Sequence, residues 1–173
     1  MKLRLILIPM TLAACAPTPS KDLRVEVHRI DASGVGSTVG AVVFSDGPAG
    51  LVIKPSLDGL PAGPHGLHVH ENPSCDPAEK DGSVQPGLAA GAHYDPAGTG
   101  RHEGPTGQGH LGDLPLLSVD DSEKAVGEAV APRLKLADLK GRSLMIHAGG
   151  DNYSDAPEKN GGGGARIACG VIP

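Results

Sequence analysis

The chain has 173 residues, a formal net charge of −5 and a hydrophobic fraction of 39%. This length fits one domain of ordinary size, and a chain without a basic stripe has no electrostatic basis for binding nucleic acid. Only Phe44, Tyr94 and Tyr153 are aromatic, so the core must be built from Val, Ile, Leu and Ala.

The first fourteen residues are expected to be a secretory signal that is not part of the folded domain. Lys2 and Arg4 precede an apolar run that is too short to span a membrane, and small residues follow it in MKLRLILIPMTLAAC. Residues 12–15, LAAC, resemble a bacterial lipobox, which predicts cleavage before Cys15 and lipidation of that cysteine. The alternative is an ordinary signal peptide cut after TLAACA. We expect three segments: a signal at 1–14, a lipid anchor and tether at 15–22, and one domain at 23–173.

The three cysteines fit an exported protein. If Cys15 carries the lipid, Cys75 and Cys169 remain, and a pair of cysteines in an oxidising compartment predicts a disulfide. The lipobox predicts a periplasmic protein that is lipid-anchored to the cell envelope. Because Ala16 and not Asp follows Cys15, the outer membrane is the expected location. Loss of two positive charges with the signal changes the net charge from −5 to −7.

Eight stretches have the alternation or the β-branched content of strands. The first, 23–30, alternates Leu23, Val25 and Val27 with polar residues. Helical periodicity is weak, with a single turn expected at 136–141. Short strands separated by turn signals predict an all-β antiparallel sandwich or barrel. The other expected strands lie at 38–46, 50–57, 66–71, 114–120, 124–136, 143–149 and 165–172.

Two intervals, residues 71–113 and 148–164, interrupt this series of strands. Both contribute to the high totals of 26 glycines and 16 prolines. Loops of this length inside a compact domain are usually functional or disordered. We expect both to be ordered functional loops, with the first one held in place by Cys75.

The histidines are arranged as metal ligands are. His68 and His70 alternate in GLHVHENPSC, and alternate residues of a strand share a face, so both imidazoles can reach one ion. Together with His147 on a later strand they form a nitrogen-rich set, which favours copper(II). The first long loop adds a set typical of tetrahedral zinc, namely His93, His102, His110 and Asp113. The neighbouring His65 is expected to be structural, with its ring hydrogen-bonded to backbone.

Five motifs resemble those of copper–zinc superoxide dismutases of the bacterial periplasmic branch. In order they are GLHVHENPSC, GAHYDP, RHEGPTGQGHLGDLP, HAGGDNYSD and GGGGARIACGVI, and the resemblance extends over nearly the whole chain after residue 22. It implies an eight-stranded antiparallel Greek-key β-sandwich or barrel with two long functional loops. It also implies an antioxidant oxidoreductase with one copper and one zinc per chain, which dismutates superoxide to O₂ and H₂O₂ and so protects the cell envelope.

The resemblance also implies a role for each matching residue. The matched copper ligands are His68, His70, His93 and His147. The matched zinc ligands are His93, His102, His110 and Asp113. His93 then bridges the two metals, and it is expected to be catalytic together with Arg166, the arginine beside the copper channel. Asp151 matches the carboxylate that joins His68 to His102, and Cys75 and Cys169 match the intrasubunit disulfide.

A non-catalytic copper- and zinc-binding lipoprotein of the same fold is the alternative function. Arg166 and the bridging His93 favour the enzyme, because a copper carrier needs neither a bridging zinc nor a guide for superoxide. The surface of a homodimer carries no motif, so the sequence leaves both a monomer and a homodimer open. No nucleic-acid partner is expected, and no membrane contact other than the N-terminal lipid anchor.

Overall fold

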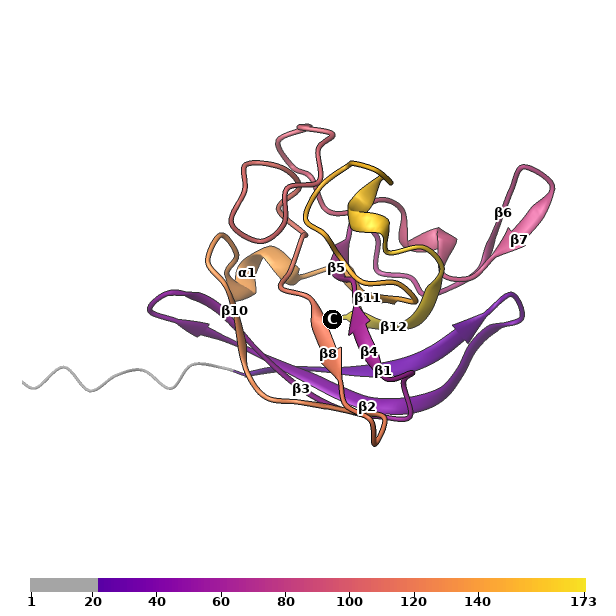
Figure 1. The fold of residues 1–173 in the computed structure, drawn as a ribbon, viewed down its shortest axis with the longest axis horizontal. Helices are drawn as coiled ribbons and strands as arrows, with labels where there is room; N and C mark the ends of the chain where they lie inside the picture. Colours follow the sequence, from indigo (N-terminus) through magenta and orange to yellow (C-terminus); the bar gives the residue numbers. More distant parts are fainter. Residues whose placement is uncertain (1–21) are drawn as a thin grey trace, which may run out of the picture.

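The computed structural model describes residues 22–173, so the expected signal, Cys15 and most of the tether lie outside the described residues. Strands dominate and curl into an antiparallel sheet (Figure 1). The predicted all-β fold is confirmed. In the described part of the chain, no helix combines the length and the apolar character needed to cross a bilayer.

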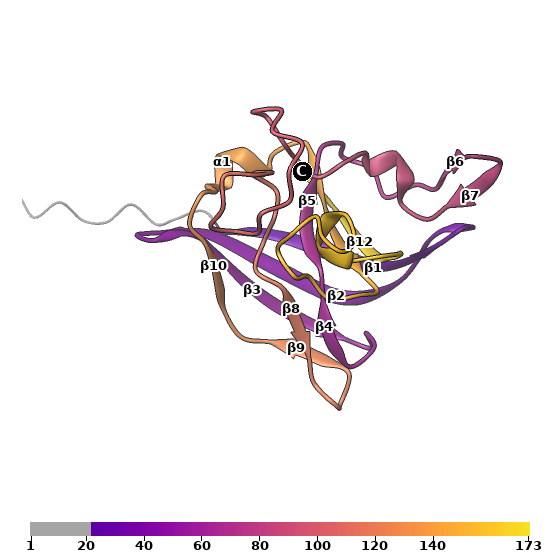
Figure 2. The same ribbon diagram turned by 45° about the horizontal axis from the view of Figure 1, so that its top comes forward.

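The main sheet has eight strands in the order β10-β3-β2-β1-β12-β11-β5, with β9 also paired to β3. Three hairpin-connected strands, β1 to β3, lie beside β12, which returns from the other end of the chain as in a Greek key (Figures 1 and 2). The bounds are β1 (Leu23–Asp31), β2 (Gly34–Gly47), β3 (Gly50–Asp58), β5 (Leu67–His70), β9 (Lys124–Val126), β10 (Ala129–Ala131), β11 (Arg142–His147) and β12 (Arg166–Ile172).

Shorter elements lie outside this sheet. β4 (Gly63–His65) pairs with β8 (Leu117–Val119), and β6 (Ala78–Lys80) forms a hairpin with β7 (Ser83–Gln85) inside the first long loop. The short helices are η1 (Leu88–Ala90), α1 (Leu136–Leu139) and η2 (Asn160–Gly162). α1 lies where one helical turn was expected.

One expected strand, residues 124–136, is broken into β9 and β10, and α1 begins at its last residue. Gly127 has a φ of 124°, which a side chain rarely adopts, and Pro132 has no backbone N–H for a sheet ladder. These two residues end β9 and β10, respectively. Gly127 therefore separates β9 from β10 through its backbone conformation, and a pattern of alternating apolar residues does not reveal such a conformation.

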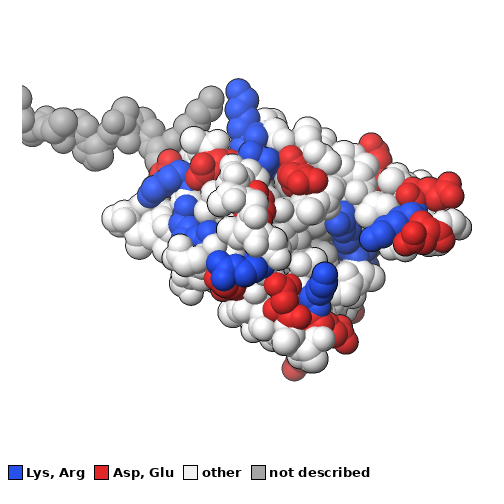
Figure 3. Space-filling view, turned by 90° about the horizontal axis from the view of Figure 1, so that it is seen from above, with Lys and Arg blue, Asp and Glu red and all other residues white. Residues whose placement is uncertain are grey.

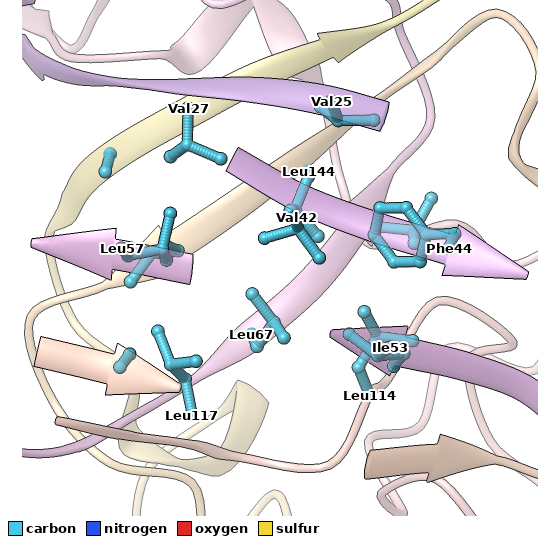
Figure 4. Close-up of a cluster of buried hydrophobic side chains, with 14 of the residues drawn as sticks. Val25, Val27, Val42, Phe44, Ile53, Leu57, Leu67, Leu114, Leu117 and Leu144 are labelled. Atoms are coloured by element: carbon cyan, nitrogen blue, oxygen red, sulfur yellow. The ribbon is translucent and has the colours of Figure 1, made fainter. Parts of the chain in front are cut away.

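The core is aliphatic, as the composition predicts. Val25 and Val27 of β1 face inward against Val42 of β2 and Leu144 of β11 (Figure 4), and all four are at most 1% exposed. Phe44 is the aromatic ring in this cluster and is fully buried. This core forms a rigid support for the loops that lie at the top of Figure 1.

A disulfide joins Cys75, early in the first long loop, to Cys169 in β12, with 5.7 Å between their Cα atoms. The predicted pairing of these two cysteines is confirmed. Both are buried and pack with Ile30, Ala90 and Met145 in a second, smaller apolar cluster. The loop is thus fastened to a central strand of the sheet.

We predict that Cys75→Ser destabilises the oxidised protein by roughly 2–5 kcal/mol, the usual cost of removing a native disulfide from a small secreted domain. Thermal unfolding measures the loss. Cys169→Ser should cost a similar amount, and the double variant should cost little more than either single one, because all three lack the same bond. Unchanged unfolding of Cys75→Ser would contradict the prediction.

Candidate metal centre

Four histidines meet at one end of the sheet. His68 and His70 come from β5, His147 from the end of β11, and His93 from the first long loop, where it forms an isolated bridge with His70. One potential ligand atom from each lies within 4.8 Å of the other three, and all four residues are buried. The rings of His68 and His93 are 3.9 Å apart between centroids.

A second group shares His68 and His93 with the first. It contains His68, His93, His102 and Asp113, again with ligand atoms within 4.8 Å of one another. His110 lies beside this group and outside that limit, with its Nδ1 3.4 Å from Asp113 Oδ1. The sequence prediction places His110 in the zinc set in place of His68.

The free ring nitrogens test whether these groups fit a cation. Within residues 22–173, five buried histidine nitrogens have no hydrogen-bond partner: His68 Nδ1, His70 Nε2, His102 Nδ1, His110 Nδ1 and His147 Nε2. In four of these rings the other nitrogen is hydrogen-bonded to a carbonyl or a carboxylate, at 2.7 to 3.1 Å. This fixes the ring and directs a lone pair inward, as metal-ligating histidines require. Buried polar atoms without partners are costly, so the donor set fits metal ions.

His102 Nδ1 and Asp113 Oδ2 are 2.9 Å apart, yet they are not aligned as a hydrogen bond. Two ligands that point at a common ion approach each other in this way. The contact therefore places a ring nitrogen and a carboxylate oxygen within reach of one cation.

The carboxylate of Asp151 links the two groups by accepting hydrogen bonds from the ring nitrogens of His68 and His102 that are not available to a metal. His68 Nε2 donates to Asp151 Oδ2 at 2.8 Å, and His102 Nε2 donates to Asp151 Oδ1 at 2.7 Å. The Asp151 side chain is fully buried, so these bonds are shielded from water. One carboxylate therefore fixes the ring orientation of one histidine from each proposed metal set.

Burial sets the charge of the histidines in the first group. It lowers the pKa of His68 and of His70 well below the usual value, and it lowers the pKa of His147 to about 4. These rings are neutral at neutral pH, so no proton competes with a cation for their lone pairs.

His102 behaves differently. Burial acts to lower its pKa, but Asp113 and Asp151 outweigh that effect and raise the pKa to about 9. The same contacts from His102 and His93 outweigh burial at Asp113 and lower the pKa of its carboxyl well below the usual range. A cation that binds here must displace a proton from His102, whereas the ligand Asp113 is already ionised.

Arg166 stands at the start of β12, beside His147 in the sheet register. Its Nη1 donates to the carbonyl of Gly87 at 2.5 Å and its Nη2 to the carbonyl of Gly91 at 2.7 Å. The Gly91 carbonyl also accepts from His70 Nδ1 at 2.9 Å. Arg166 and Lys80 line a cavity of about 230 Å³, so two positively charged side chains border the same hollow.

Three contacts around the centre went unpredicted. Asp155 accepts from the backbone N–H of His102 at 2.8 Å and from that of Asn160 at 3.1 Å, which joins the two long loops. The carbonyl of Gly91 and the backbone of Gly161 carry no side-chain signal in the sequence.

His65, expected to be structural, places its ring nitrogens 2.7 Å from the carbonyls of Pro61 and His147.

Gly161 leaves the space that the Asp151 link needs. Its φ is 73°, and a Cβ at this position would collide with the Asp151 carboxylate and approach His102 Nε2 to 2.8 Å. Gly98 has a similar φ of 63°, but within the described part of the chain nothing lies within 4 Å of a Cβ there. Comparing a Cβ added at Gly161 with one added at Gly98 therefore distinguishes the effect of a steric collision from the conformational cost of a positive φ.

Comparison with known proteins gives a consistent result. Residues 38–172 match the family of copper/zinc superoxide dismutases. A superoxide dismutase (Cu-Zn) from Brucella abortus is 55% identical over 157 residues, which cover 90% of this chain and 91% of the relative. The corresponding enzyme of Escherichia coli K12 is 47% identical over 169 residues, 97% of this chain and 96% of the relative.

Solved structures show the same likeness. A Cu/Zn superoxide dismutase from Brucella abortus matches with a TM-score of 0.87 at 55% identity, covering 88% of this chain and 100% of that one. The monomeric copper, zinc superoxide dismutase from Salmonella enterica matches with a TM-score of 0.80 at 51% identity, with coverage of 88% and 100%.

We predict that Gly161→Ala weakens zinc binding about tenfold or more, because it displaces the carboxylate behind His102, and such outer contacts are usually worth 10- to 100-fold in metal affinity. Gly98→Ala is the matched control and should cost only the backbone strain, on the order of 1 kcal/mol of stability. Competition with a zinc chelator measures the affinities. Equal zinc affinity in both variants would contradict the role of Asp151.

Proposed function

This chain belongs to the copper/zinc superoxide dismutase family, and from that membership we propose which of its residues carry out the reaction. The protein is an oxidoreductase that dismutates superoxide, with copper and zinc as its cofactors. The residue assignment depends on one observation, the two buried ligand groups that have His68 and His93 in common. A metal-binding protein without turnover is not favoured, because the matched relatives are named as enzymes.

Copper is held by His68, His70, His93 and His147, and zinc by His93, His102, His110 and Asp113. His68 has a potential ligand atom within 4.8 Å of those of the other members in both groups. Because its Nε2 is hydrogen-bonded to Asp151, only Nδ1 is left, and that atom can ligate only one ion. We assign it to copper. The buried, unpaired Nδ1 of His110 then supplies the fourth zinc ligand. Four N and O ligands, one of them a carboxylate, are typical of zinc.

When bound, copper exchanges the electron that converts one superoxide to O₂ and, with two protons, a second to H₂O₂, while zinc keeps its oxidation state. The chain's own residues orient the ligands and move protons. His93 Nδ1 lies 2.9 Å from Asp113 on the zinc side, which leaves Nε2 for the copper side. His93 Nε2 is therefore the atom that can deliver a proton to the product.

Arg166 attracts and orients the substrate. Positive and negative side chains are interspersed on the face that carries the loops (Figure 3), so no broad field draws an anion to the centre. A guanidinium that stays charged at working pH and is fixed by two carbonyls supplies a local focus. The carboxylate of Asp155, in the second long loop, accepts from the backbone N–H groups of His102 and Asn160 and so does not neutralise Arg166.

The envelope location follows from the N-terminal sequence. We propose a periplasmic protein attached through a lipid on Cys15, at the outer membrane. An N-terminal signal and a disulfide between Cys75 and Cys169 both fit an oxidising compartment.

The ligand assignment predicts that His93→Ala reduces binding of both metals, whereas Asp113→Ala reduces mainly that of zinc. The shared imidazole contributes to two sites, while the carboxylate belongs to one. Metal analysis after loading with both ions, followed by dialysis, measures the content. A fully loaded wild-type protein that retains only one metal would contradict the bridged assignment.

The proposed role of Arg166 predicts that Arg166→Glu lowers kcat/KM about tenfold or more, within the 10- to 1000-fold range of electrostatic steering. Copper and zinc content should stay near one each. Lys54→Glu, an exposed site on β3, is the control for the same change in net charge and should have little effect. Pulse radiolysis across a salt series measures the rates. Equal rates for both variants at every salt concentration would rule out guidance by Arg166.

The proposed anchor predicts that Cys15→Ser abolishes lipid attachment and either releases the protein in soluble form or leaves it unprocessed. Membrane fractionation and intact-mass measurement check this. Unchanged fractionation without a mass difference would reject lipidation at Cys15.

A further inference from the structure

Arg142, the first residue of β11, makes one contact with the preceding helix and two with parts of the chain that are distant in sequence. Its Nε donates to the carbonyl of Asp138 in α1 at 2.8 Å, and its Nη1 donates to the carbonyl of Glu71 at 3.3 Å. Its Cζ lies 3.4 Å from the centroid of the Tyr94 ring. This distance is well within the range of a cation–π contact.

The contacts of Arg142 with Glu71 and Tyr94 both lie next to proposed metal ligands in the sequence. Glu71 follows His70, and Tyr94 follows His93. His70 and His93 face each other as an isolated antiparallel bridge, with Glu71 N–H donating to the carbonyl of Ala92 at 3.1 Å. The guanidinium therefore holds the two backbones immediately beyond the paired histidines.

The backbone of Tyr94 extends this link toward the zinc side. Its N–H donates to the carbonyl of Val69, between His68 and His70, at 2.9 Å. Its carbonyl accepts from the N–H of Gly112, which precedes Asp113, at 2.8 Å. A shift of the Tyr94 ring thus moves peptides that flank ligands of both proposed sites.

We propose that Arg142 is a positioning residue for His70 and His93, acting through the Glu71 carbonyl and the Tyr94 ring. α1 provides the fixed end of this link through the carbonyl of Asp138. Arginine suits the position because its planar fork can donate along two edges while its face stacks on an aromatic ring. A lysine nitrogen cannot make all three contacts. The inference depends on the proposed assignment of His70 and His93 as copper ligands.

The test compares copper(II) spectra, copper affinity and thermal stability in five single variants and one double variant of the full mature chain. Arg142→Leu removes all three contacts, and Arg142→Lys keeps the charge alone. Tyr94→Leu removes the aromatic face, while Tyr94→Phe retains it. Arg24→Leu, at an exposed position of β1, is the matched arginine control.

We expect the EPR hyperfine splitting and the visible absorption band to change in Arg142→Leu and Tyr94→Leu, with copper affinity lowered about tenfold, as for other residues behind metal ligands. Arg142→Lys should restore these values only in part. Tyr94→Phe and Arg24→Leu should match the wild type. Because both residues act through one contact, the losses in the Arg142→Leu/Tyr94→Leu double variant should be smaller than additive.

Two results would overturn the proposal. The first is a wild-type spectrum and copper affinity in Arg142→Leu beside a lowered Tm, which would make the arginine a stabilising residue only. The second is full restoration by Arg142→Lys, which would make the fork unnecessary. His93→Ala separates this failure from failure of the ligand assignment. If the spectrum of His93→Ala is unchanged, the ligand assignment is wrong, and so is the inference that depends on it. If the spectrum of His93→Ala changes while the spectrum of Arg142→Leu does not, only the proposed role of Arg142 is wrong.

Discussion

The hydrogen bonds of the Asp151 carboxylate to His68 and His102 are the constraint on which the centre depends. They connect a strand of the sheet, the first long loop and the second long loop at one buried point. Because each histidine commits one nitrogen to this carboxylate, the remaining nitrogen has a single direction in which to point. The positive-φ backbone of Gly161 lies against this contact and leaves room for no side chain.

Burial explains why such a cluster needs support from several elements. Six metal-site residues are at most 6% exposed, and burial of polar groups is unfavourable unless each finds a partner. The aliphatic sheet supplies rigidity, and backbone carbonyls of Gly91 and Gly164 occupy the outer nitrogens of His70 and His147. The disulfide and Arg166 then fasten the first loop to β12. The loops are ordered because they are tied to the sheet at several points.

Much of this was predictable because side-chain type and spacing carried the signal. Alternation placed His68 and His70 on one strand, and cysteine counting paired Cys75 with Cys169. The motif series indicated that Asp151 lies between His68 and His102, which are its hydrogen-bond partners in the structure. Contacts made by backbone groups could not be predicted in this way. The carbonyl of Gly91 and the conformation of Gly161 depend on tertiary geometry, and the break at Gly127 divides a segment whose apolar pattern indicates one strand.

The place of β12 has a consequence for biosynthesis. It is the last strand of the chain, yet it lies in the middle of the sheet, between β1 and β11. Neither the sheet nor the disulfide can be completed until β12 has been synthesised, and such long-range pairing is slow to form. Loss of β12 would therefore remove an interior strand and leave β1 and β11 without the partner that joins them.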